Sequence, residues 1–153
     1  MKTIHLIVVG KIKDKNIEAL EENYAKRFKD PKLLIHEVKS HSENLNLEAK
    51  EVLSRISDLE KDGKSFVVLM AENGKEYDSP SFSKWVFNHL ESRQEKMIFV
   101  IGGAAGHGEQ VKERSDSSLS LSLMTFPHKL ARLLFVEQMY RAVTIFNKHP
   151  YHK

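Results

Sequence analysis

Strand-like and helical patterns alternate along this chain, and the alternation constrains its fold more than any other feature. Each strand-like run is short and apolar or β-branched, and most are followed by a segment whose apolar residues recur at helical spacing. The runs are Thr3–Val9, Leu33–Val38, Phe66–Ala71, Met97–Ile101 and Ser118–Met124. This order is typical of a mostly parallel open sheet with helices on both faces, so we predict an α/β fold in a single domain, 1–153.

Capping residues and turn residues indicate where the connecting segments begin. Asp14 is placed to cap a first helix, and Ser79 followed by Pro80 predicts the start of another helix after the third strand. The sequence "ENGK", residues 72–75, predicts a turn between that strand and helix. The longest helical pattern runs over His128–Phe146, near the end of the chain.

Composition removes several classes of protein and site. The chain has no cysteine, so disulfides, thiolate metal sites and a cysteine nucleophile are excluded. No apolar run approaches the ~18 residues of a membrane-spanning helix. These features predict a soluble protein of the cytoplasm.

Positive charge is concentrated at the end of the chain. The formal net charge is +3, but Thr125–Lys153 alone carries +4 and the remainder −1. The charged residues of this segment are Lys129, Arg132, Glu137, Arg141, Lys148 and Lys153. Such a concentration attracts a polyanion, although a solvated helix face has the same composition.

Two loops follow predicted strands at the sheet edge where parallel α/β proteins bind ligands. The first, "IGGAAGHGE", has four glycines but neither the Lys-Ser/Thr of a P-loop nor the spacing of a dinucleotide fingerprint. It is either a ligand loop or a tightly packed turn. The second, "LSLMTFPHK", supplies apolar side chains, hydroxyls and backbone amides. Together they predict an apolar pocket suited to a flat adenine ring held by main-chain hydrogen bonds.

The chain ends in "NKHPYHK", a run of groups that titrate near neutral pH or stack on flat rings. It is either a solvated tail or part of a site. His149 and His152 provide only half of a zinc site, and no cysteine completes it, so we predict no metal.

Three segments, "IGGAAG", "SLSLSLMTFPHKLARLLFVEQMYRA" and "HPYHK", resemble the RlmH family of ribosomal RNA methyltransferases, in the SPOUT or trefoil-knotted superfamily. The resemblance extends over the whole chain; one departure is Ala104-Ala105, where the family often has polar residues. It implies a C-terminal trefoil knot, S-adenosyl-L-methionine as cofactor and a homodimer. The implied substrate is a pseudouridine of 23S rRNA in the assembled ribosome, methylated at N3.

The resemblance also implies roles for individual residues. The cofactor contacts would be Met70, Gly102, Gly103, Leu121, Ser122, Leu123, Met124, Thr125 and Phe126. The catalytic candidates are Arg141, Tyr151 and His152, and the RNA-binding candidates are His128, Lys129 and His149.

Several alternatives stay open at this point. Arg141 either stabilises negative charge or forms an i, i+4 pair with Glu137, while His152 either takes a proton or hydrogen-bonds the base edge. Tyr151 would stack on a base, and His128 and Lys129 either meet phosphate or face solvent. The alternative functions are a non-catalytic RNA-binding factor, an enzyme acting on another base or ribose, and a flavodoxin-like nucleotide-binding domain.

Overall fold

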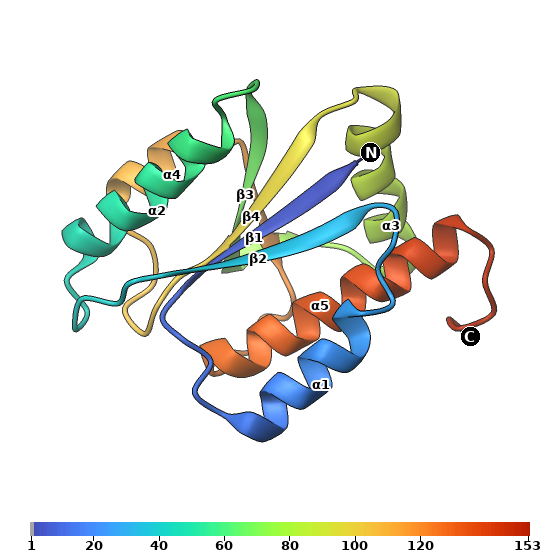
Figure 1. Ribbon diagram of the computed structural model, residues 1–153, viewed down its shortest axis with the longest axis horizontal. Helices are drawn as coiled ribbons and strands as arrows, with labels where there is room; N and C mark the ends of the chain where they lie inside the picture. Colours follow the sequence, from blue (N-terminus) through green and yellow to red (C-terminus); the bar gives the residue numbers. More distant parts are fainter. Residues whose placement is uncertain (1) are drawn as a thin grey trace.

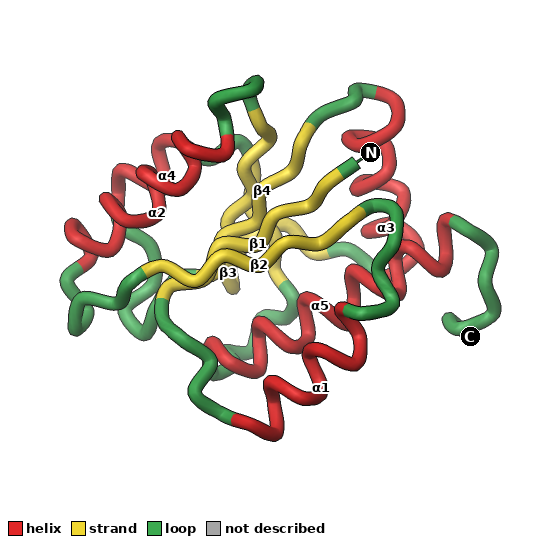
Figure 2. The backbone as a smooth tube through the Cα atoms, viewed as in Figure 1, coloured by secondary structure: helices red, strands yellow, loops and turns green. Residues whose placement is uncertain are grey.

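The computed structural model describes residues 2–153 and contains a five-stranded sheet between two layers of helices (Figures 1 and 2). The strand order is β2-β1-β4-β3-β5, and every pair of neighbouring strands is parallel. The strands are β1 (Thr3–Val9), β2 (Lys32–Val38), β3 (Ser65–Glu76), β4 (Lys96–Ile101) and β5 (Ser117–Ser120). The predicted α/β class and parallel sheet are therefore confirmed.

Helices cover both faces of this sheet (Figure 1). One layer holds α1 (Lys15–Ala25), α3 (Ser79–Phe87) and α5 (His128–Phe146), and the other holds α2 (Leu45–Leu59) and α4 (Glu109–Arg114); a short π-helix, η1 (Asn88–Ser92), extends α3. Alternate residues of β1 serve the two cores: Leu6 packs in the cluster with Phe135 of α5, and Ile7 packs in the cluster with Val52 of α2.

Two local predictions were wrong. Residues 72–75 form no turn, because β3 continues through them, with a register shift against β5 between Met70 and Lys75. A Cβ atom on Gly74 would lie 2.7 Å from the Leu119 nitrogen, so this glycine serves close strand approach. The cap of α3 is Asp78, whose carboxylate accepts from the Ser81 N–H, one residue before the predicted Ser79.

The fifth strand is shorter than its leucine–serine alternation predicts. β5 ends at Ser120, and residues 121–127 leave the sheet as a loop that leads into α5. The trefoil knot stays a prediction. No helix among residues 2–153 is both long and apolar enough to cross a membrane.

A chain of hydrogen bonds links two histidines of the sheet to α2. Arg55 has only donors, so its Nη1 donates to His36 Nδ1 at 3.2 Å, and the His36 proton sits on Nε2. His36 Nε2 then donates to His5 Nδ1 at 2.9 Å. Burial and the neighbouring His36 lower the pKa of His5 from 6.5 to about 4, and burial and Arg55 lower the pKa of His36.

This pair makes folding stability depend on pH. The unfolded chain takes up protons near the ordinary pKa of 6.5, which the folded chain excludes, so stability is full above that pH and falls as the pH drops toward 4. We expect His5 alone to reduce the free energy of unfolding by about 2 kcal/mol between pH 7.5 and 5. Urea unfolding at both pH values measures this loss. The double variant His5→Leu, His36→Leu should show a flatter dependence, and an unchanged dependence would assign the loss to other groups.

Candidate functional site

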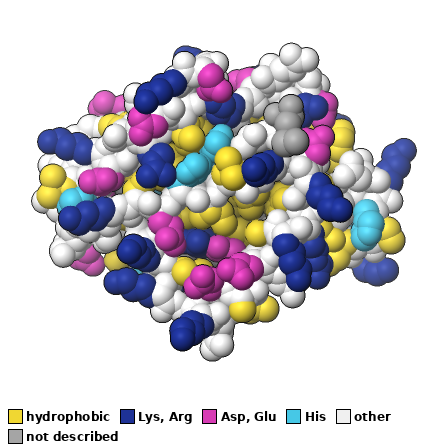
Figure 3. Space-filling view, in the orientation of Figure 1, with side chains coloured by type: hydrophobic (Ala, Val, Ile, Leu, Met, Phe, Trp, Pro, Cys, Tyr) yellow, Lys and Arg dark blue, Asp and Glu magenta, His cyan; other side chains and the backbone are white. Residues whose placement is uncertain are grey.

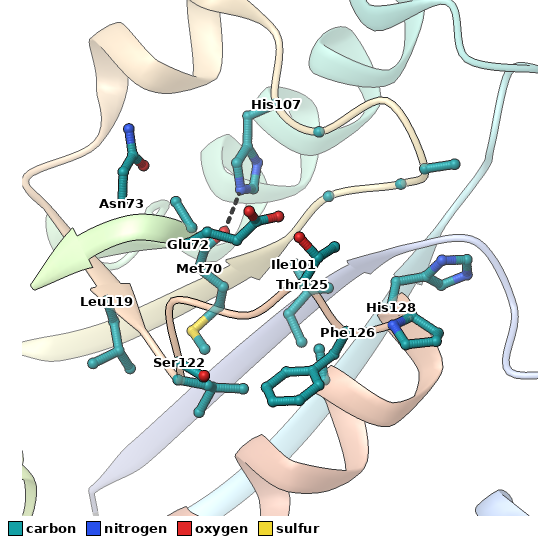
Figure 4. Close-up of a pocket in the computed structure, with 18 of the residues that line it drawn as sticks. Met70, Glu72, Asn73, Ile101, His107, Leu119, Ser122, Thr125, Phe126 and His128 are labelled. Carbon is teal, nitrogen blue, oxygen red and sulfur yellow. Dashed lines mark hydrogen bonds between the residues drawn. The ribbon is translucent and has the colours of Figure 1, made fainter. Parts of the chain in front are cut away.

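A cavity of about 860 Å³ opens at the carboxyl ends of β3, β4 and β5, where the sequence predicts a ligand site (Figure 4). Its volume lies in the range of small-molecule and cofactor sites. It is lined by Met70, Ala71, Glu72, Asn73, Ile101, Gly102, Gly103, Ala104, Gly106, His107, Leu119, Leu121, Ser122, Met124, Thr125, Phe126, Pro127, His128 and Ala131. The structure thus brings together every predicted cofactor residue except Leu123, whose side chain is 73% exposed outside the cavity.

The glycine loop, residues 102–108, contributes backbone to this cavity because side chains are absent at its crowded points. A Cβ atom on Gly102 would lie 2.5 Å from the Gly106 carbonyl oxygen, and Gly106 itself has φ +90°. Gly103 and Gly106 form an isolated antiparallel bridge that closes the loop on itself. The loop is therefore tightly packed on itself, and Gly102, Gly103 and Gly106 also line the cavity. Its role as a ligand loop stays a prediction.

Glu48 lies beneath the glycine loop and was not foreseen as part of the site. The residue is 4% exposed, and its Oε2 accepts from the Ser40 hydroxyl at 3.1 Å and the His41 N–H at 2.9 Å. Its Oε1 has no partner among the described residues and lies 3.2 Å from the Cβ position of Gly103. A buried acceptor at this place holds the β2–α2 connection and faces the loop that lines the cavity. In the sequence, the only indication that Glu48 is buried is its place next to the apolar face of the α2 helix.

Two further polar residues of the cavity were also missed. His107 Nε2–H donates to the Met70 carbonyl at 2.8 Å, which joins the glycine loop to the middle of β3 (Figure 4). Burial lowers the pKa of His107, so this imidazole is neutral at pH 7. Glu72 brings the one carboxylate of the lining and points into the cavity between His107 and Ile101 (Figure 4).

The loop between β5 and α5 closes the opposite side of the cavity. Ser120 Oγ donates to the Ser122 carbonyl at 2.9 Å, and Ser122 Oγ accepts from the Met124 N–H at 3.0 Å, so local bonds shape this loop. His128, the first residue of α5, lines the cavity, whereas Lys129 does not. Of the predicted RNA-binding residues, only His128 lies at the cavity.

The C-terminal tail folds back onto its own helix. Lys148 has φ +59°, and the His149 N–H donates to the Thr144 carbonyl at 2.8 Å, so the chain reverses directly after α5. This reversal returns Tyr151 and His152 to Arg141. His149 remains exposed at the turn, apart from the other two tail residues.

Arg141 is the centre of the tail cluster. Its Nε and Nη2 donate to Glu137 Oε1 at 3.0 and 2.6 Å, so the predicted i, i+4 pair forms. Its Nη1, which takes no part in that pair, donates to His152 Nδ1 at 3.0 Å. Arg141 therefore forms the predicted pair with Glu137 and also joins α5 to the tail through His152. Its predicted role in stabilising negative charge stays a prediction.

Tyr151 packs tightly into the same cluster. Its hydroxyl donates to Glu137 Oε1 at 3.1 Å, the Arg141 guanidinium carbon lies 4.9 Å from its ring centroid, and Tyr140 meets it edge-on at 4.9 Å. Burial and bonds to Tyr24 and Glu137 raise the pKa of Tyr151 to about 12, so the phenol stays protonated at neutral pH. Its stacking on a base stays a prediction.

The cavity and the tail cluster occupy opposite ends of α5. His128 lines the cavity at the start of the helix and Arg141 binds the tail near its end, which separates them by about 20 Å along the helix axis. Within this chain, the two clusters are too far apart to contact the same atom of a substrate. Among residues 2–153, no three histidine, aspartate or glutamate side chains gather as metal ligands.

Known proteins resemble this chain over its length. Residues 1–152 match the family described as "Predicted SPOUT methyltransferase". Ribosomal RNA large subunit methyltransferase H of Christiangramia forsetii is 40% identical over 154 residues, covering 98% of each chain, and its namesake from Acholeplasma laidlawii is 38% identical, covering 98% and 99%.

A solved structure shares the fold at low sequence identity. The SpoU methyltransferase AviRb from Streptomyces viridochromogenes, in complex with the cofactor AdoMet, aligns with a TM-score of 0.51 and 14% identity. The alignment covers 90% of the present chain and 56% of AviRb, and at this identity it bears on the fold alone.

Proposed function

The chain belongs to the SPOUT methyltransferases, in the family of ribosomal RNA large subunit methyltransferase H, and we propose that it methylates N3 of a pseudouridine in 23S rRNA. The methyl donor is S-adenosylmethionine, and the substrate is the assembled ribosome in the cytoplasm. The observation that carries the proposal is the cavity that the glycine loop and the β5–α5 loop form together, since both loops carry the family resemblance.

The residues of the cavity fit this cofactor. Its walls combine apolar side chains such as Leu121 and Phe126 with the open backbone of Gly102 and Gly103, which suits a nucleoside held by main-chain hydrogen bonds. A Cβ atom on Gly102 would lie 2.5 Å from the Gly106 carbonyl oxygen, so a side chain there would displace the loop that lines the cavity. The Glu72 carboxylate complements the positive charge of a sulfonium or an α-ammonium group.

The chemistry divides between positioning and the management of one proton. When bound, S-adenosylmethionine supplies an already activated methyl group. The protein must orient N3 of the base in line with that group, and orientation contributes several kcal/mol to lowering the barrier. It must also stabilise the negative charge that develops on the base when N3 loses its hydrogen. For that purpose His152 carries a donor and Arg141 carries a positive charge beside it, whereas the Tyr151 hydroxyl already donates to Glu137.

The hydrogen bond from Arg141 favours one of the two predicted roles of His152. Because an arginine only donates, His152 Nδ1 is the acceptor, and the neutral ring carries its proton on Nε2. In this tautomer Nε2–H is a donor toward a carbonyl of the base and takes no proton, so the N3 proton passes to solvent water. We therefore assign His152 to hydrogen-bonding the base edge, with the guanidinium of Arg141 behind it.

We propose further that the active form is a homodimer in which the tail of one protomer completes the cavity of the other. The separation of about 20 Å between the two clusters requires such an exchange if both act on one base. Leu123, Met124, Leu130 and Leu134 are 73%, 73%, 41% and 38% exposed beside the cavity and along α5, and a second copy would bury them. Leu134 lies midway between His128 and Arg141, where a two-fold axis exchanges the ends of the helix.

The function is tested by labelled methyl transfer to ribosomes from cells that lack this modification. We expect one methyl group on N3 of a 23S rRNA pseudouridine. We also expect S-adenosylmethionine to bind the chain and to raise its melting temperature in a thermal-shift assay. Transfer to another base or to ribose would place the chain elsewhere among the SPOUT enzymes. Absence of both cofactor binding and transfer would favour a non-catalytic RNA-binding factor.

A further inference from the structure

The structure shows which basic side chains are free to contact an external partner, and two of the residues in the charge pattern of the sequence are not among them. Of the basic residues near the chain end, Arg132 is 6% exposed and bonds to Glu21 and Glu37, while Arg141 is occupied by Glu137. The lysines that form ion pairs within 4.0 Å among residues 2–153 are Lys2, Lys61, Lys96 and Lys112. Exposed lysines without such a pair are therefore the candidates for contact with an external polyanion.

Three of these lysines stand on one short loop at the cavity edge of the sheet. The lysine loop, residues 10–15, comprises the connection from β1 to α1 and the first residue of α1, and it exposes Lys11, Lys13 and Lys15. The Gly10 N–H donates to the Val38 carbonyl at 2.8 Å, which brings the exposed Lys39 beside the same loop. Figure 3 shows Lys and Arg side chains over this connection, at the lower left of the view.

The lysine loop lies next to the proposed cofactor cavity. β1 and β4 are neighbours with Val8 opposite Ile101, so the loop and the glycine loop leave the sheet side by side. Val9 Cγ1 is 3.3 Å from the Cβ position of Gly103. In Figure 1 the β1–α1 connection runs past the first turn of α5, which begins at His128.

The loop is held rigidly rather than left as a flexible surface turn. Ile12 is 8% exposed, and its N–H donates to Glu37 Oε2 at 3.0 Å. The same oxygen accepts from Arg132 Nη1 at 2.7 Å, and Arg132 belongs to the α5 turn that follows His128. The buried Ile12 thus anchors the loop to α5 and leaves the lysines on either side of it facing outward.

The backbone at Lys13 is unusual for a lysine. Its φ of +46° lies in the left-handed region, which disfavours residues with a Cβ and where asparagine or glycine is the common choice. Asp14 is committed to capping α1 through the N–H groups of Asn16 and Ile17, so it does not neutralise the neighbouring lysines by a direct pair. A lysine retained at a strained position is consistent with a requirement for its charge.

We propose that the lysine loop, with Lys39, binds the phosphate backbone of the rRNA that flanks the target nucleotide. This inference rests on the proposed function for the identity of the RNA. The loop lies beside the cavity, so phosphates bound there would belong to nucleotides close to the reacting base. It supplies a sequence-independent contact with the RNA.

The experiment compares Lys11→Ala, Lys13→Ala with a matched control, Lys61→Ala, Lys64→Ala, which removes two lysines at the opposite edge of the sheet. Two readouts are taken between about 50 and 200 mM KCl: co-sedimentation with ribosomes that lack the modification, and kcat/KM for methyl transfer. We expect the loop variant to bind about tenfold more weakly, with a slope of log K against log salt reduced by about 2. The loop variant should bind S-adenosylmethionine with wild-type affinity. The control variant should bind ribosomes with wild-type affinity.

A third variant separates charge from loop structure. Lys13→Gly relieves the left-handed backbone, so its melting temperature should equal or exceed that of the wild type while ribosome binding falls. Ribosome binding and a salt slope equal to wild type in the double variant would overturn the proposal. Because binding is measured without turnover, a wild-type chain that binds ribosomes through these lysines yet transfers no methyl group would refute the proposed function alone.

Discussion

Deletion of Tyr151–Lys153 should reduce methyl transfer to ribosomes by about a thousandfold, because it removes His152 and the ring that packs against Arg141. The cavity lies about 20 Å away in the same protomer, so the fold of that cavity should be unchanged. We expect the dissociation constant for S-adenosylmethionine to rise by no more than about threefold. Radiolabel transfer and calorimetric titration measure the two effects separately.

Deletion of Lys153 alone is the matched control, since this residue is exposed and takes no part in the tail cluster. Its activity should match the full chain. The point variant His152→Phe tests the same role without shortening the chain, and its melting temperature should stay close to the wild-type value. A truncated chain that methylates ribosomes at a near-normal rate would show that the tail only covers the end of α5.

The parts of the fold that depend on local patterns could be predicted from the sequence. The last helix was expected over His128–Phe146 and has those bounds, because its apolar spacing and the preceding proline are local signals. The course of residues 72–75 was not predictable in this way. Their composition favours a turn, but pairing of Lys75 with Leu119 of β5 keeps them extended, and that partner lies far along the chain.

In the candidate site, too, features with local signals could be predicted and features that depend on tertiary contacts could not. Strand ends and glycines indicate where the cavity lies, and all but Leu123 of the cofactor residues that the family resemblance implies line it. Glu48 was missed because its importance depends on the glycine loop packing above it, a tertiary contact. The pair of Arg141 with Glu137 follows from helical spacing, whereas the bond to His152 depends on the chain reversal at Lys148, a residue with no turn signal of its own.

Heterodimers that combine two inactive chains should recover activity if the tail acts across the interface. One chain carries Gly102→Val, which places side-chain atoms against the Gly106 carbonyl and so distorts the loop that lines the cofactor cavity, and the other ends at Pro150. Each homodimer should lose nearly all methyl transfer. A heterodimer isolated through two different tags holds one intact cavity facing one intact tail, so we expect about half of the wild-type rate per dimer.

The alternative arrangement gives a different result. If each tail served its own cavity, both sites of the heterodimer would be incomplete and the isolated heterodimer would be inactive. Gel filtration checks that both chains still pair, and Ala104→Trp provides a second blocked cavity, because Ala104 is an exposed part of the lining and its replacement leaves the loop glycines in place. Recovery with both blocked variants would assign the tail to the partner's cavity. Absence of recovery in a stable heterodimer would require the tail to move by about 20 Å within one chain. That movement would break the bonds of Tyr151 to Glu137 and of His152 to Arg141.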